Sequence, residues 1–293
     1  MPTPLSLGSI TIERIIEQDR LPFMPFAQFF PAVTPELIAE NRHWLEPDYL
    51  DPASGKVVLT IQSYVVRANG LIILVDSCVG NHKARPARPL WHMMASDAWQ
   101  TNLAALGLSV EDIDVVLCTH LHGDHVGWNT RLENGRWVPT FPKARYLFAN
   151  RELDFWSAKH KRDPASCPWM EDSVLPIVAA RRAEIVTSTH SITEAVRMIP
   201  TPGHTIDHFS VEVGERSGEQ ALITGDMVHS PLQIKYPEIG MISDYDSAEA
   251  GRTRRAVFTR CCDDDILLCT AHFPGNPIGR VQQQGSAFRF ICD

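Results

Sequence analysis

The chain has 293 residues, of which 44% are hydrophobic, and this length and composition predict one large domain or two closely fused halves with an ample core. The net charge of −8 and the dispersed Lys and Arg residues argue against a nucleic-acid or polyphosphate partner, which would need a basic footprint. No apolar run approaches the ~18 residues of a membrane span, and the first residues lack the pattern of a signal peptide, so we expect a cytoplasmic protein without a membrane partner.

The N-terminal region combines one predicted strand with an aromatic segment. Residues 10–16 alternate as a first strand would. Residues 21–31 contain too many prolines for a helix or a central strand, yet they carry four Phe and one Met. These aromatics either pack into the core or a subunit contact, which is the favoured interpretation, or form a hydrophobic wall or lid over a site. Trp44 has the same two interpretations.

The next predicted elements lead to the first chemically informative stretch. Residues 57–66 and 71–76 are β-rich runs joined through Asn69-Gly70, which is a strong hairpin signal. Residues 81–95 are typical of a surface loop, and residues 96–106 have helical spacing. A short apolar run at 115–118 then predicts a buried strand.

A cluster of metal-ligand side chains follows this strand in His120-Leu121-His122-Gly123-Asp124-His125. In an extended segment residues two apart share a face, so His120 and His122 can bind one cation. After a turn at Gly123, Asp124 and His125 can face a second cation beside it. Three imidazoles and a carboxylate within six residues at a strand end indicate a binuclear metal site rather than a chance group of surface histidines.

This hexapeptide resembles the metal-binding signature of the metallo-β-lactamase superfamily. The resemblance implies an α/β (α+β) fold, an αββα sandwich of two mixed β-sheets flanked by helices. It also implies three later ligands at strand ends, which are matched by His204, Asp226 and His272. The match covers residues from about 57 to 278. We therefore expect a single domain over 1–293, with an N-terminal arm over about 1–50 and an insertion over about 150–185.

The same resemblance assigns the ligands to two metal ions. One ion would be held by His120, His122 and His204, the other by Asp124, His125 and His272, and Asp226 would bridge both. A donor set without thiolates suits two zinc ions, although iron, manganese or cobalt fit the same ligands. Two such ions supply a hydroxide nucleophile at neutral pH, and Asp124 would orient it as a catalytic residue. His82 and His92 are not expected to be ligands, since the set is complete without them.

Two further residues have open roles beside this set. Asp76, at the end of a predicted strand, is either an outer hydrogen-bond partner of a ligand or a capping residue. His229 is either a catalytic group that hydrogen-bonds the substrate or protonates the leaving group, or a polar residue on the rim. Many acyl-homoserine lactonases carry Tyr at that offset from the bridging Asp. Methyl-parathion-hydrolase-like members resemble this chain more, with a similar Gly-Asp-x-Val-His run.

The remaining chain adds predicted elements and weak pocket candidates. We expect a hairpin over 132–138, a strand at 144–148 and a helix that is capped by Asn150. Strands are predicted at 195–199, 208–213 and 221–224, a helix at 247–261 and a last strand before His272. By their position alone, Trp156, Trp169 and Met170 are candidates for a substrate pocket. Seven Cys without Cys-x-x-Cys spacing predict reduced core residues.

These observations predict a dinuclear metal-dependent hydrolase of small, neutral, apolar esters. A lactone, such as the acyl-homoserine lactones cleaved in quorum quenching, is the first expected substrate class, and an organophosphate triester is the second. The alternatives are an iron-dependent redox enzyme of the same fold, similar to persulfide dioxygenases, a thioester hydrolase, and a metal-stabilised binding protein without catalysis. Relatives are often dimers, so a homodimer is a further expectation by analogy.

Overall fold

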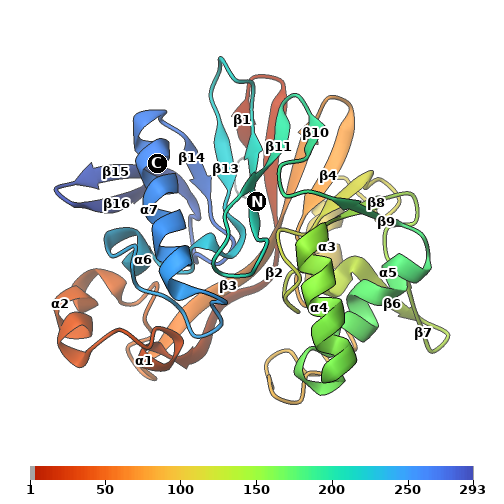
Figure 1. The fold of residues 1–293 in the computed structure, drawn as a ribbon, viewed down its shortest axis with the longest axis horizontal. Coiled ribbons are helices and arrows are strands. Elements are labelled where there is room, and N and C mark those ends of the chain that lie inside the picture. Colours follow the sequence, from red (N-terminus) through yellow and green to blue (C-terminus); the bar gives the residue numbers. More distant parts are fainter. Residues whose placement is uncertain (1–3, 293) are drawn as a thin grey trace. The chain divides into compact units, whose positions relative to one another are not determined.

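The computed structural model describes residues 4–292, in which two seven-stranded mixed sheets are combined with helices (Figure 1). The first sheet has the strand order β1 (Leu5–Leu7), β2 (Ile10–Pro25), β3 (Lys56–Ala68), β4 (Leu71–Val75), β5 (Val115–Leu117), β8 (Arg145–Ala149), β9 (Ala183–Val186). The second has the order β10 (Ser191–Thr193), β11 (Val196–Pro200), β12 (Phe209–Val213), β13 (Ala221–Ile223), β14 (Leu267–Cys269), β15 (Ile278–Gln284), β16 (Ala287–Cys292). The predicted fold class is confirmed in these terms.

The other elements are short hairpin strands and helices. Strands β6 (Thr130–Glu133) and β7 (Arg136–Pro139) form a separate hairpin. The α-helices are α1 (Phe26–Phe29), α2 (Pro35–Leu45), α3 (Ala98–Ala105), α4 (Asn150–Arg162), α5 (Leu175–Ala179), α6 (Pro231–Lys235) and α7 (Ser247–Asp263). Four single turns are 3₁₀ or π-helical: η1 (Gly127–Asn129), η2 (Pro164–Ser166), η3 (Met170–Val174) and η4 (Gly225–Met227). No helix of residues 4–292 is both long and apolar enough to cross a membrane.

The chain divides into two compact units. The first unit comprises Ile61–Arg197 with the N-terminal residues up to Glu17, and the second comprises Gln18–Thr60 with the residues from Met198 onward. The long strands β2 and β3 each contribute residues to both units.

In the first unit, four parallel strands place the histidine motif at one edge of a sheet. Strands β4, β5, β8 and β9 are parallel neighbours, with pairs such as Val75 with Leu117. The carboxyl ends of parallel strands meet at the same edge, where α/β proteins commonly carry their sites. The residues after β4, the motif after β5 and the start of α4 therefore lie together. The preceding β3–β4 hairpin turns at Asn69 and Gly70 with φ of 53° and 77°, as predicted.

In the second unit, strand directions gather three more loops at one edge. Strand β14 runs parallel to β13, and β12 runs antiparallel to it. The loop that enters β12 and the loops that leave β13 and β14 consequently lie side by side. Helix α7 packs against β15, and Phe258, Leu268 and Phe288 form part of the core beneath it. These three loops contain His204, Asp226 and His272.

The aromatic segment is more regular than the sequence predicts. Strand β2 continues through Pro25 and α1 follows directly, so the expectation that residues 21–31 form no helix is wrong at Phe26–Phe29. The strand tolerates its prolines because β1 pairs only with Ile10–Ile12. The rest of β2 therefore has one edge without hydrogen bonds to β1, where a missing N–H costs nothing. Phe26, Phe29 and Phe30 are buried in a core cluster of the second unit, against which Trp44 also packs. The favoured interpretation, that the aromatics pack into the core, is confirmed.

The start of α4 and the cysteines test two further local predictions. The cap of α4 is Ala149 without a side-chain hydrogen bond, while Asn150 is the first helical residue, so the predicted Asn150 cap is wrong by one position. The Asn150 amide oxygen instead accepts from the backbone N of Arg151 at 2.8 Å. All seven cysteines are free thiols, as the spacing predicts, but they are not all core residues, because Cys292 is exposed and Cys262 is only partly buried.

Candidate metal centre

In the first unit, Asp76 connects the ends of β4 and β5. Its Oδ1 accepts from the Thr119 backbone N at 2.8 Å, and its Oδ2 accepts from the Thr119 hydroxyl at 2.9 Å. The same Oδ2 lies 2.9 Å from Nδ1 of His125, and all three residues are buried. A carboxylate only accepts hydrogen bonds, so His125 donates from Nδ1 and keeps the lone pair of Nε2 for another partner. Asp76 thus orients His125 and is more than a cap.

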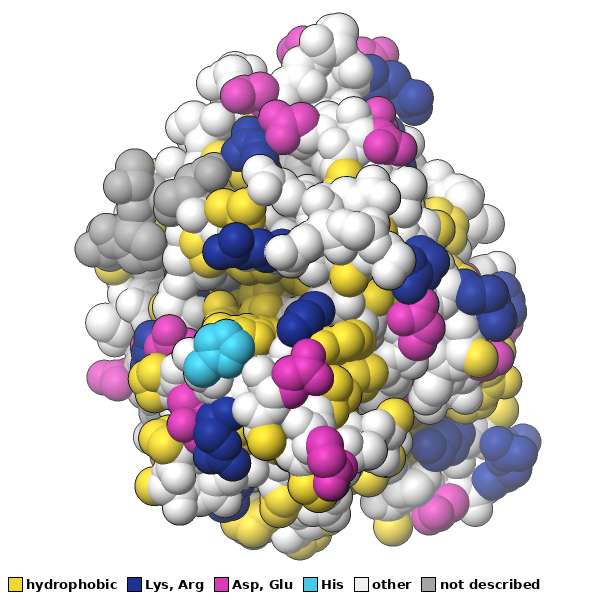
Figure 2. Space-filling view, turned by 90° about the vertical axis from the view of Figure 1, so that its left-hand side faces the viewer, with side chains coloured by type: hydrophobic (Ala, Val, Ile, Leu, Met, Phe, Trp, Pro, Cys, Tyr) yellow, Lys and Arg dark blue, Asp and Glu magenta, His cyan; other side chains and the backbone are white. Residues whose placement is uncertain are grey.

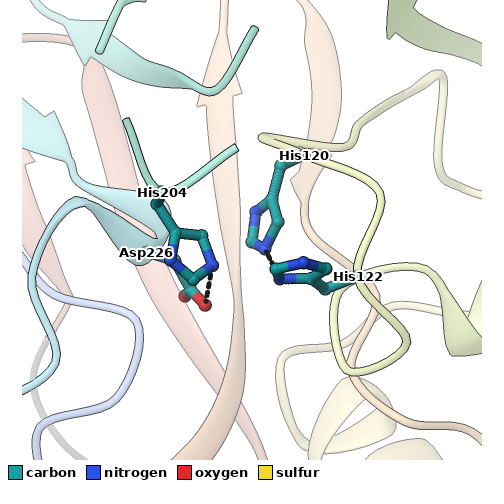
Figure 3. Close-up of side chains that lie close together, drawn as sticks. All are labelled: His120, His122, His204 and Asp226. Atoms are coloured by element: carbon teal, nitrogen blue, oxygen red, sulfur yellow. Dashed lines mark hydrogen bonds and ion pairs between the residues drawn. The ribbon is translucent and has the colours of Figure 1, made fainter. Parts of the chain in front are cut away.

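His120 has the same ring orientation by a different route. The Thr119 hydroxyl, which already donates to Asp76, lies 3.1 Å from Nδ1 of His120 and can only accept there. The Nε2 atom of His120 therefore carries the lone pair, and it lies 2.9 Å from Nδ1 of His122 (Figure 3). Zinc–nitrogen bonds of 2.0–2.1 Å place two ligand nitrogens ~3 Å apart, so these two rings are spaced as ligands of one cation.

Asp124 and His125 follow as the second half of the motif. Asp124 Oδ2 lies 3.8 Å from His125 Nε2, and the Asp124 side chain is only partly buried. The two donor atoms therefore lie on the side of His125 that faces away from Asp76. The assignment of Asp124 and His125 to one cation stays a prediction.

In the second unit, three imidazoles surround the carboxylate of Asp226. Asp226 lies in η4, just after β13, and is 3% exposed. Its Oδ2 lies 3.2 Å from Nε2 of His204, as Figure 3 shows, and 3.1 Å from Nε2 of His229. Its Oδ1 lies 2.8 Å from Nε2 of His272. Donor atoms of Asp226, His229 and His272 all lie within 4.8 Å of one another.

Two of these imidazoles are oriented by hydrogen bonds at Nδ1, the ring nitrogen that does not face Asp226. His204 Nδ1 lies 3.0 Å from Asp244 Oδ1, and His272 Nδ1 lies 3.0 Å from the Thr60 carbonyl oxygen. Both rings donate from Nδ1 and present Nε2 to Asp226. Burial lowers the pKa of His204, but Asp226 and Asp244 outweigh it and raise this pKa to about 9. A cation bound at Nε2 would displace that proton, so metal binding is expected to release protons.

The backbone of Asp226 is held by a further histidine. The Asp226 N–H donates to Nε2 of His208 at 2.9 Å, and Nδ1 of His208 lies 2.8 Å from the Thr201 hydroxyl. His208 immediately precedes β12, the antiparallel neighbour of β13, which brings it beside the start of η4. His208 therefore positions the carboxylate through the main chain.

His229 is buried beside Asp226 and is not a residue of the rim. Its backbone N donates to Gln233 Oε1 at 2.8 Å, and its ring stacks on His272 with centroids 5.3 Å apart. The Phe29 and His229 rings form a T-shaped pair with a centroid distance of 5.6 Å. Burial lowers the pKa of His229, which keeps the ring neutral. Its Nδ1 has no hydrogen-bond partner within residues 4–292, so this atom remains available to another molecule.

Two tryptophans of the first unit flank His122. The ring centroids of Trp156 and Trp169 lie 5.2 Å and 6.2 Å from that of His122, both in edge arrangements. Trp169 donates to the Leu121 carbonyl oxygen at 2.6 Å, and Trp156 donates to Glu152 at 2.6 Å. Both predicted aromatic candidates therefore lie beside the motif. Met170, the third, is fully buried in the core.

Each unit by itself presents a group of side chains that could hold a metal ion. His120, His122, Asp124 and His125 lie in the first, and His204, Asp226 and His272 lie in the second. The donors are imidazole nitrogens and carboxylate oxygens. In four of the five imidazoles Nδ1 is hydrogen-bonded to the protein, which leaves Nε2 as the atom that can bind a cation. Divalent cations of the zinc type fit this donor set. His82 and His92 are exposed, and His92 Nδ1 instead accepts from the Arg85 backbone N.

Apart from Asp76, the residues that orient these candidate ligands were not identified from the sequence. They are Thr60, Thr119, His208 and Asp244, together with Glu152, which accepts from the Leu121 backbone N at 3.2 Å. None belongs to a recognisable motif. Position at a strand end was the single available signal, and it applied to Thr119 and His208.

The comparisons with known proteins agree with this description. The model of the metallo-beta-lactamase superfamily matches residues 57–272. The lactamase-like protein vrtG of Penicillium aethiopicum is 28% identical over 166 residues, which cover 57% of this chain but only 39% of that relative.

Solved structures show the same fold. A hydrolase named AbOPH, of the beta-lactamase superfamily, is 23% identical with a TM-score of 0.80, covering 98% of this chain and 96% of its own. AidC, a dizinc quorum-quenching lactonase in complex with an N-hexanoyl-L-homoserine product, is 18% identical with a TM-score of 0.79, covering 99% and 97%. The match of the family model over most of the chain shows that this protein belongs to the metallo-β-lactamase superfamily.

Proposed function

We propose that this protein is a dinuclear metal-dependent hydrolase that cleaves small, neutral, apolar esters, with lactones as the first substrate class. The observation that carries the proposal is the common orientation of His120, His125, His204 and His272, each with Nδ1 hydrogen-bonded and Nε2 presented. Such anchoring is the usual outer arrangement of histidines that bind metal ions. Membership of a superfamily with hydrolase members supports the same reaction class.

The proposed ligand assignment follows the superfamily pattern. His120, His122 and His204 would hold one divalent cation, Asp124, His125 and His272 the other, and Asp226 would bridge them. Two such cations, most simply zinc, supply a hydroxide nucleophile at neutral pH and polarise the scissile carbonyl group. In this scheme the chain contributes the orientation of the nucleophile through Asp124. His229 contributes a hydrogen bond to the substrate or to its leaving oxygen.

The proposed substrate class rests on the surroundings of His122. Trp156 and Trp169 provide apolar ring surface beside it, which suits an acyl chain or an aromatic leaving group. The dizinc lactonase AidC, which shares the fold, carries an N-hexanoyl-L-homoserine product. An N-acyl-homoserine lactone is therefore the first substrate that we propose. An organophosphate triester is the second, because His229 lies in the Gly-Asp-x-Val-His run of methyl-parathion-hydrolase-like proteins.

The test compares initial rates of zinc-loaded protein on three substrates. These are N-hexanoyl-homoserine lactone, a dialkyl nitrophenyl phosphotriester and a nitrophenyl carboxylic ester. Asp226→Asn is run beside Asp114→Asn, whose carboxylate accepts from the Ile72 backbone N and pairs with Lys143. We expect one substrate to be cleaved far faster than the others, with this activity lost in Asp226→Asn alone. Three inert substrates in a protein that holds two zinc ions would refute the proposal and make iron-dependent oxygen consumption the next assay.

A further inference from the structure

The second unit carries a cavity that shares no residue with the proposed metal centre. It has a volume of about 480 Å³ and is lined by residues from the end of α2 and the loop after it, from α6 and from the β15–β16 hairpin. Figure 2 views the side of the molecule that carries these elements and shows a hollow with hydrophobic side chains at its floor and basic side chains at its rim. Ligand pockets of proteins commonly have volumes of 300–1,000 Å³, so this one can hold a small molecule.

Aromatic rings form the walls of this cavity. Trp44, Tyr49, Phe288 and Phe290 line it. Two of them are held by buried Phe273, whose ring centroid lies 5.7 Å from that of Tyr49 and 5.3 Å from that of Phe290. Because Phe273 belongs to the hydrophobic core, these walls are already in place before a ligand arrives. Several ring faces in one cavity favour a flat aromatic ligand.

Among residues 4–292, the charged residues of the lining are basic, and none of them is acidic. Lys235 donates from Nζ to the neutral Asn41 amide oxygen at 2.6 Å and lies 5.8 Å from the Trp44 ring centroid. Within residues 4–292 the Lys235 ammonium group has no carboxylate partner, and the exposed Arg289 side chain has no hydrogen bond or ion pair. A cation at an aromatic cavity, without a counter-charge from the described residues, can recognise an anionic group.

We propose that this cavity is a second binding site, specific for a small aromatic carboxylate, whose ring lies among Trp44, Tyr49 and Phe290 and whose carboxylate pairs with Lys235. Arg289 adds a second positive charge at the lining. The ring of the ligand contributes apolar burial, and the ammonium group distinguishes an acid from a neutral aromatic compound of the same size. The site does not depend on the metal centre or on its reaction.

Calorimetric titration of the full-length protein tests this proposal with 2-naphthoate as the probe. The matched neutral probe is 2-naphthalenemethanol, which has the same ring system without the carboxylate. Each titration is repeated after removal of metal by a chelator, because a carboxylate can also bind to zinc. We expect one equivalent of 2-naphthoate to bind with and without metal, at least tenfold more tightly than the alcohol.

Variants assign the binding to the cavity. Lys235→Gln keeps a donor for Asn41 but removes the charge, so it should lower the affinity for 2-naphthoate at least tenfold and leave the alcohol unaffected. Trp44→Leu should weaken both probes. Arg280→Gln is the control, since Arg280 lies on the same hairpin but pairs with Asp265.

Three results would overturn the proposal. The first is an unchanged affinity in Lys235→Gln. The second is a loss of 2-naphthoate binding on removal of metal, which would place the probe at the metal centre. The third is an affinity that falls as the protein is concentrated, which would indicate that a second copy of the chain covers the cavity.

Discussion

Nδ1 of His125 lies 2.9 Å from Oδ2 of Asp76, and the same carboxylate accepts two hydrogen bonds from Thr119. The three interactions connect the ends of the parallel strands β4 and β5, so one buried carboxylate determines the orientation of His125 and, through the Thr119 hydroxyl, that of His120. The side chain that orients two candidate ligands of the first unit is therefore not one of the predicted ligands itself.

Replacement of this carboxylate should weaken metal binding. In Asp76→Asn the amide cannot accept every donor that faces it, so His125 is no longer held in one tautomer, and we expect the affinity for zinc to fall about 10–100-fold. Competition with a chromogenic chelator measures this change. Asp114→Asn, which alters a carboxylate at the opposite end of β5, should bind zinc like the wild type. Equal affinities in both variants would show that Asp76 has no such role.

Loss of the His229 ring should affect turnover and spare the metal ions. If His229 hydrogen-bonds the substrate or its leaving oxygen, His229→Ala should lower kcat about 10²-fold while two zinc equivalents remain bound. Steady-state kinetics and metal analysis of the same sample test this. His82→Ala serves as a control, because His82 is exposed. Release of zinc from His229→Ala would instead make His229 a ligand, as its proximity to Asp226 and His272 allows.

Trp169 should determine the affinity for apolar substrates. Its ring lies beside His122 and against Gly123, with the nearest ring atom 3.4 Å from the position that a Cβ atom of Gly123 would occupy. We expect Trp169→Ala to raise KM about tenfold for a long-chain acyl lactone, less for a short-chain one, because each buried methylene contributes about 0.8 kcal/mol. Trp169→Phe should retain most of the difference in KM between the long-chain and the short-chain lactone. Equal KM changes for both chain lengths would contradict this role.

The aromatic segment should contribute to stability rather than to catalysis. Phe30 is fully buried in the core cluster of the second unit. Phe30→Ala should lower the free energy of unfolding by about 3–5 kcal/mol, measured by urea denaturation, and leave KM unchanged. Leu132→Ala removes an exposed side chain and should change stability by less than ~0.5 kcal/mol. A stable Phe30→Ala variant with a raised KM would support the alternative interpretation as a lid.

Lys83 should make stability depend on pH in the alkaline range. The buried ammonium group donates to Thr130 Oγ1 at 2.6 Å and to the Asp172 carbonyl oxygen at 3.0 Å, and burial lowers its pKa from 10.5 to about 7. The folded state therefore favours the neutral amine. The contribution of the neutral Lys83 amine to the free energy of unfolding is complete above pH ~10.5. It is lost as the pH falls towards 7, by up to about 5 kcal/mol.

Comparison with Lys83→Met isolates this contribution. Urea denaturation at several pH values between 7 and 10 should show the free energy of unfolding of the wild type rising relative to that of the variant. Other groups that titrate in this range affect both proteins alike. Parallel profiles would show that Lys83 titrates at the same pH in the folded and unfolded states.

The sequence by itself determined the features that depend on neighbouring residues. The His120–His125 motif after an apolar strand, the Asn69-Gly70 turn and the Gly225-Asp226 turn are local patterns, because strand periodicity and turn conformation are decided within a few residues. The family resemblance supplied the fold class and the later ligands from the same short stretches. These features were predictable because each requires particular residue types at fixed spacing.

The tertiary structure alone decided which distant groups orient the ligands and what surrounds them. Asp244 lies 40 residues from His204, and Thr60 lies 212 residues from His272. The contacts of Trp156 and Trp169 with His122, the burial of His229 and the aromatic cavity of the second unit likewise join segments that no local pattern relates. Strand order and direction create these contacts, because parallel and antiparallel neighbours bring loops to one edge of a sheet irrespective of their separation along the chain.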